Sequence, residues 1–325
     1  MSIYFDGSDL IQIKSAIANA VHNAFSNLKD SEPQLVANLV WQLPKQINEI
    51  KLSGNIKISA GGVFVHSRPL VTCTSFPTKT PSSVEIGDVL LIRTLVVDGG
   101  VKQKQALLLQ AKKAKSIPAK PDNVNQWHLY EKWPRFTYAA RSGDLAGKKR
   151  YIQEPDMYDA AKYLLIASTL SYAYCTGCFR CSPCDCFCWH MGYAHFTAKP
   201  TKPDIGAYRC FVCELVDFLN GNVGKVFEKP ASRTRGWNQV IHDLINDTAK
   251  AKTIFMGRAN QKSSKYQRGN GRMFLTQTNE SDFFMVSGSS KGSGENNKPP
   301  EDLEQWEESD HGGISIIEVV IEQEE

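Results

Sequence analysis

The chain has 325 residues, and its composition is that of an ordinary folded protein: an apolar fraction of 42% and a charged fraction of 22% exclude wholesale disorder, a collagen-like repeat and a coiled coil. The net charge of +4 hides an asymmetry, because residues 295–325 carry eleven acidic residues and one Lys. Residues 1–294 therefore hold 37 basic and 23 acidic residues, an excess of +14. Such a basic body suits binding to a phosphate backbone, although a solvated surface also explains it.

The N-terminal segment MSIYFDGSDL lacks the basic region and apolar stretch of a signal peptide. No apolar run approaches the roughly 20 residues that span a bilayer. We therefore expect a cytoplasmic protein that does not interact with membranes.

Helical and strand-like periodicities follow one another along the chain. Near the N-terminus, apolar residues at helical spacing predict two helices, the second with Ser31 as N-cap and Pro33 in its first turn. From residue 56 the spacing changes to alternation, which predicts consecutive strands of one sheet. The predicted elements are helices over 8–29 and 32–43; strands over 56–66, 68–75, 84–97 and 105–113; a helix over 123–138 that stops near Pro134; a helix running into a strand over 158–170; helices over 213–228 and 236–251; and a strand over 313–323.

Together these elements predict an α/β (α+β) fold, with a central mixed sheet flanked by helices. The strand over 105–113 has apolar residues on both faces, so we expect it to be central and buried. Residues 1–286 are predicted to form one domain, including a Cys-rich insertion at about 171–213. A flexible acidic linker over 287–312 and a C-terminal strand or tail over 313–325 would follow.

Three residues carry a pattern that suits hydrolysis of a phosphodiester. Asp88 lies at the edge of an apolar strand, and Gln110-Ala-Lys112 ends the later apolar run. Positions i and i+2 of a strand point the same way, so the Gln110 amide and the Lys112 ammonium project together. A carboxylate, an amide oxygen and a cation would suit a divalent metal that activates water. The competing interpretation is a turn Asp and a surface Lys.

This pattern resembles the nuclease core of the PD-(D/E)XK, or restriction-endonuclease-like, superfamily over roughly residues 30–170. The resemblance implies that Asp88 and Gln110 bind Mg²⁺ or Mn²⁺, and that Lys112 orients or deprotonates the attacking water. It also implies an acidic ligand from the preceding helix, for which Glu32 is the first candidate and Glu49 the second. Gln110 replaces the more frequent Glu, which removes one negative charge from the metal site.

Eight of the nine cysteines lie between residues 175 and 213. In a reducing cytosol such a cluster favours metal binding over disulfides, and Zn²⁺ is commonly held by two Cys-x-x-Cys pairs. Cys175, Cys178, Cys210 and Cys213 form one such set, with Cys181 and Cys184 as the alternative first pair. An iron–sulfur cluster and an unliganded loop are the competing interpretations.

Two functions remain in view. The first is a metal-dependent endonuclease that hydrolyses DNA; the resemblance suggests a prokaryotic restriction or antiphage-defence setting, with an activating protein partner or a homo-oligomer. The second is a non-catalytic, zinc-stabilised module for nucleic-acid binding or interaction on a decayed nuclease fold. In the first case Gln126, Tyr130 and Lys132 would contact the scissile backbone, although core packing of Trp127 and Trp133 explains this segment as well.

Overall fold

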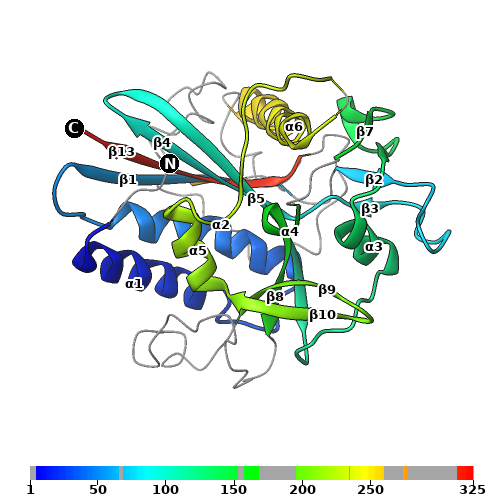
Figure 1. Ribbon diagram of the computed structural model, residues 1–325, viewed down its shortest axis with the longest axis horizontal. Coiled ribbons are helices and arrows are strands. Elements are labelled where there is room, and N and C mark those ends of the chain that lie inside the picture. Colours follow the sequence, from blue (N-terminus) through cyan, green and yellow to red (C-terminus); the bar gives the residue numbers. More distant parts are fainter. Residues whose placement is uncertain are drawn as a thin grey trace.

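The computed structural model describes residues 5–65, 69–152, 157–167, 195–233, 235–259, 274–276 and 313–324. Its elements are arranged as a large twisted sheet, helices on both faces and a small second sheet at one end (Figure 1). The helices are α1 (Gly7–Ala24), α2 (Glu32–Asn48), α3 (Val124–Lys132), α4 (Met157–Ala160), α5 (Phe211–Leu219) and α6 (Trp237–Ala259), with a 3-10 turn over Gly143–Leu145. The strands are β1 (Ile56–Phe64), β2 (Leu70–Thr72), β3 (Val84–Glu85), β4 (Val89–Val97), β5 (Gly100–Ala114), β6 (Phe136–Tyr138), β7 (Lys149–Arg150), β8 (Ala161–Ala167), β9 (Phe196–Thr201), β10 (Asp204–Cys210), β11 (Lys225–Val226), β12 (Phe274–Thr276) and β13 (Ser315–Gln323).

The large sheet is mixed and, within the described residues, has nine strands. Eight follow the order β10-β9-β8-β5-β4-β13-β1-β12, and β11 pairs with part of β5. β4 and β5 are antiparallel, whereas β5–β8 and β13–β4 are parallel. The predicted α/β class, with a central mixed sheet and flanking helices, is therefore confirmed. The prediction that the strand over 105–113 is central and buried is also confirmed. β5 lies between β4 and β8, its residues Gln105–Ala111 are buried, and Lys112 and Lys113 are partly exposed.

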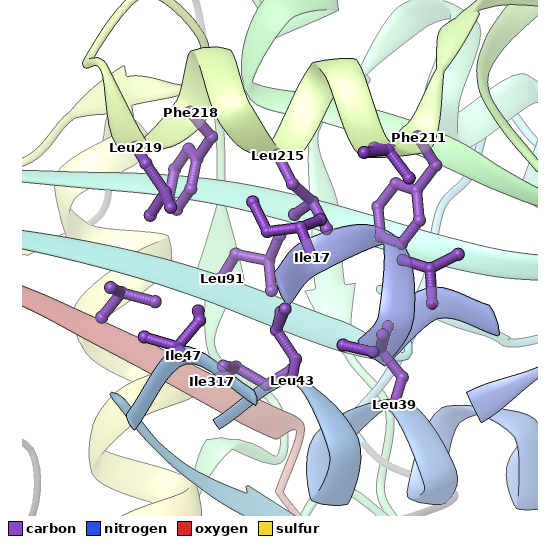
Figure 2. Close-up of a cluster of buried hydrophobic side chains, with 14 of the residues drawn as sticks. Ile17, Leu39, Leu43, Ile47, Leu91, Phe211, Leu215, Phe218, Leu219 and Ile317 are labelled. Atoms are coloured by element: carbon purple, nitrogen blue, oxygen red, sulfur yellow. The ribbon is translucent and has the colours of Figure 1, made fainter. Parts of the chain in front are cut away.

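One face of this sheet packs against α1, α2 and α5. Figure 2 shows Leu215 and Phe218 of α5 and Leu43 of α2 pointing toward one another into one cluster, with Leu91 of β4 between them. The helix α1 adds Ile17, which is fully buried in the same cluster. Burial of apolar side chains contributes about 1.5–3 kcal/mol each, so this layer is a main source of stability.

The other face packs against α3, α6 and the small sheet, through a second apolar cluster. The small sheet has the order β3-β2-β6-β7 within the described residues, and all its pairs are antiparallel. The prediction that residues 56–113 form consecutive strands of one sheet is therefore wrong. The segment 84–97 breaks after Glu85, where the Ile86 N–H donates to the Pro69 carbonyl, and β4 starts afresh at Val89 in the large sheet.

Three predicted helices have different ends in the structure. α3 stops at Lys132, because Trp133 adopts a left-handed conformation (φ 42°), and the rest of the predicted helix becomes β6. α5 ends at Leu219 and is followed by a turn, since Gly221 and Gly224 both have positive φ. The stretch over 158–170 gives only one turn of helix before β8, as a helix running into a strand. No described helix is both long enough and apolar enough to cross a bilayer.

The C-terminal strand is an internal member of the large sheet. β13 runs parallel to β4 from Ser315 opposite Val89, and antiparallel to β1 on its other side. Seven of its residues, Ser315–Ile321, are buried. The strand predicted over 313–323 thus completes the sheet that contains β1 and β4, whereas the predicted linker over 287–312 lies outside the described residues.

Candidate active site

Asp88 lies in the break between β3 and β4, at the edge where the small sheet meets the large one. Its N–H donates to the Leu109 carbonyl at 2.9 Å, which fixes it beside the end of β5. Its carboxylate Oδ2 accepts the Ala111 N–H at 2.6 Å and also a hydrogen bond from the Gln110 amide. The structure therefore brings together Asp88 and the Gln110–Lys112 motif, as the sequence predicts.

The Gln110 side chain takes part in a chain of amide hydrogen bonds. Its Nε2 donates to Asp88, while its Oε1 accepts from Gln126 Nε2 on α3 at 2.7 Å. Gln126 also donates to the Glu85 carbonyl at 3.4 Å. In this arrangement Gln110 holds the Asp88 carboxylate in place. The Gln110 Oε1 atom would face a metal beside Asp88 only if the side-chain amides of Gln110 and Gln126 were both flipped.

Lys112 is held between two carboxylates. Its ammonium contacts Asp122 in the loop before α3 and lies 3.5 Å from Glu32 Oε1. Burial lowers the pKa of Lys112, but the hydrogen bond with Asp122 and the negative charges of Glu32 and Asp122 outweigh it and raise the pKa. Lys112 is therefore a cation at neutral pH.

Glu32 reaches this site from the first turn of α2. Its Oε1 also accepts the Lys113 N–H at 2.8 Å, so the helix start is fastened to the end of β5. The position is prepared by Ser31, whose hydroxyl accepts the Gln34 N–H as an N-cap. The second candidate, Glu49, caps the far end of the same helix, where it accepts a hydrogen bond from Gln46, and a 17-residue helix places it about 25 Å away.

Two carboxylates of the site were not assigned from the sequence. The Glu85 carboxyl lies close enough to Asp88 for the two groups to affect each other's pKa. Burial raises the pKa of both groups, and their mutual repulsion raises that of Asp88 further. The nearness of Glu85 to Asp88 in the chain could have indicated its role. Asp122, in contrast, lies in a loop without a periodic pattern.

The carboxylates of Asp88 and Glu85 suit a Mg²⁺ ion that keeps part of its water shell better than a metal ion enclosed by protein ligands alone. Among the described residues, no three His, Cys, Asp or Glu side chains are close enough together to hold a metal ion. Mg²⁺ is, however, usually bound by one or two carboxylates together with water and substrate phosphate. Asp88 and Glu85, which lie within hydrogen-bonding reach of each other, supply such a pair.

The cysteine site is only partly within the described residues. Cys210 ends β10 and Cys213 lies in the first turn of α5, and both side chains are buried in the cluster against α1 and α2. The four remaining predicted ligands, Cys175, Cys178, Cys181 and Cys184, lie outside the described residues. The zinc site therefore stays a prediction.

Comparison with known proteins gives no match: no family model, no curated protein and no solved structure is similar to this chain.

Proposed function

We propose that this protein is a metal-dependent nuclease that hydrolyses DNA phosphodiester bonds. One observation carries the proposal: Glu32, Asp88 and Lys112, which come from α2, the β3–β4 break and β5, are gathered where β4 begins and β5 ends. These are the residues that the resemblance to the PD-(D/E)XK superfamily selects from the sequence alone. A turn Asp and a surface Lys would have no reason to meet a helix-terminal Glu there.

The roles of the protein groups follow from their contacts. Lys112 is cationic, so it would donate a hydrogen bond to the attacking water or to a phosphate oxygen and offset the charge that develops there. Asp122 and Glu32 would keep the Lys112 ammonium in position. Gln110 would orient Asp88, because its amide and the Ala111 N–H both donate to the same carboxylate oxygen.

A divalent cation, Mg²⁺ or Mn²⁺, fits the carboxylates of Asp88 and Glu85, with Glu32 and the Gln110 oxygen as further candidates. When bound it would polarise the phosphate and lower the pKa of a water molecule. Its positive charge would also offset the repulsion between Asp88 and Glu85, which together with burial raises the pKa of Asp88.

Cleavage of supercoiled plasmid in Mg²⁺ or Mn²⁺ tests the proposal. We expect nicking by the wild type, and its loss in Asp88→Ala and Lys112→Ala. Lys102→Ala, at the exposed start of β5, is the matched control that removes a charge far from the site. Thermal unfolding provides a second readout, since Mg²⁺ should raise the melting temperature of the wild type and not that of Asp88→Ala.

The alternative, a non-catalytic module for nucleic-acid binding on the same fold, predicts salt-sensitive binding without nicking. A wild type that binds DNA but leaves the plasmid intact in both metals would refute the nuclease proposal. Undiminished nicking by both site variants would refute the assigned residues.

A further inference from the structure

The small sheet has one buried face and one partly exposed face, called the open face below, which begins at the half-buried Glu85 of the candidate active site and ends at the exposed Lys149. Cross-strand partners share a face, so Val84, Val71 and Tyr138 form the buried row against the second apolar cluster. The next row, Thr72, Thr137 and Lys149, therefore lies on the opposite face. Glu85 of β3 pairs with Leu70, two residues from Thr72, and so lies on this open face too.

The open face changes from acidic to basic along the strand order. Within the four strands, Glu85 is the only acidic residue, and it belongs to the site. At the other edge, Lys149 is exposed on β7. Neighbouring strands are about 4.8 Å apart, so β7 lies roughly 14 Å from β3. The small sheet lies at one end of the molecule, where Figure 1 labels β2, β3 and β7.

A second cation stands beside Lys149 in a fixed orientation. Arg135 immediately precedes β6 and is exposed, and its guanidinium lies 4.6 Å from the centre of the Tyr151 ring. Tyr151 immediately follows β7, so this stacked pair continues the Thr137–Lys149 row. Stacking limits the motion of the guanidinium while leaving its N–H groups available to a planar or tetrahedral anion.

We propose that this open face is the track along which one phosphodiester strand of the nucleic-acid substrate reaches the site. Arg135 and Lys149 would each bind a phosphate at the far edge, and Thr72 and Thr137 would lie beneath the backbone between them and Glu85. The inference rests on the proposed nuclease function, for which it supplies the path of the substrate. Charge complementarity selects this occupant, because the cations lie at the edge away from the carboxylates, where a polyanion is not repelled.

The test compares two double variants that each remove two positive charges. Arg135→Ala/Lys149→Ala changes the track. The control, Lys51→Ala/Lys102→Ala, changes two exposed residues at the far end of the large sheet, in the loop before β1 and near the start of β5. Binding to short fluorescein-labelled DNA, single-stranded and duplex, is measured by anisotropy in EDTA over a range of salt concentrations. Loss of two phosphate contacts should flatten the slope of log K against log salt by about 1.4 to 1.8.

The outcome separates this inference from the proposed function. A wild-type slope in the track variant, equal to that of the control variant, overturns the track even if the wild type cleaves plasmid. A flattened slope in the track variant alone supports the track, even if no cleavage is found. Asp88→Ala, assayed in the same way, should bind with the wild-type slope, since its defect lies in the reaction.

Discussion

The turn that carries Asp88 is packed so tightly that a single methyl group should disturb it. In Gly87→Ala, the new Cβ would lie 2.7 Å from Leu108 Cδ1, 3.1 Å from Leu108 Cγ and 3.2 Å from the Tyr130 hydroxyl. Leu108 is fully buried, and the Tyr130 hydroxyl is held by a hydrogen bond to the Ile86 carbonyl, so neither moves freely. Overpacking of this kind costs about 1–3 kcal/mol, and we expect that loss in the free energy of unfolding.

Denaturant unfolding of a double-mutant cycle measures this prediction. Leu108→Val removes the atom that the new methyl group meets, so Gly87→Ala/Leu108→Val should be less destabilised than the sum of the two single variants. Gly7→Ala is the control, because its Cβ would meet nothing within 4 Å, and its stability should stay within about 0.5 kcal/mol of the wild type. A neutral Gly87→Ala, or a strictly additive cycle, would refute the packing argument.

Two further predictions concern buried charges. Burial and repulsion by Glu85 raise the pKa of Asp88, so ionisation of Asp88 destabilises the fold once the pH rises above the ordinary pKa of Asp. In EDTA, Asp88→Asn should therefore be more stable than the wild type at neutral pH, and this gain should vanish in acid. Unfolding curves with a gain that does not depend on pH would contradict this reasoning. Lys162 forms a fully buried ion pair with Glu214, so Lys162→Met should cost about 3–5 kcal/mol, toward the lower end because Arg209 lies 3.9 Å from Glu214. Thermal and denaturant unfolding should show most of this loss restored in Lys162→Met/Glu214→Leu, and a double variant as unstable as the single one would argue against the pairing.

The elements that could be predicted from the sequence are those whose own residues determine their structure. The strand over 313–323 is apolar on both faces and is found as β13, and β5 is buried as its pattern indicates. Glu32 could be proposed because the resemblance implies an acidic ligand from the helix before the sheet, and Ser31 marks the first turn of that helix. Asp88, Gln110 and Lys112 follow from the order of two strands and the alternation within one.

What could not be predicted depends on contacts between distant segments. Nothing within residues 84–97 shows that Glu85 belongs to a different sheet from Val89, because the break is marked by the hydrogen bond from the Ile86 N–H to Pro69, the residue before β2. Asp122 meets Lys112 only because the loop before α3 folds back over β5. The sequence of β13 likewise does not show that its partners are β1 and β4, because this pairing depends on the rest of the sheet.

The place of β13 also bears on how the protein forms during synthesis. Since β13 separates β1 from β4, the sheet has an open seam through its middle until residues 315–323 have left the ribosome. β4 is the strand that Asp88 precedes, and its exposed edge would be unpaired throughout this time. The nascent chain therefore keeps Asp88 on an incomplete sheet, and the candidate site gains its finished support only after β13 has paired with β1 and β4.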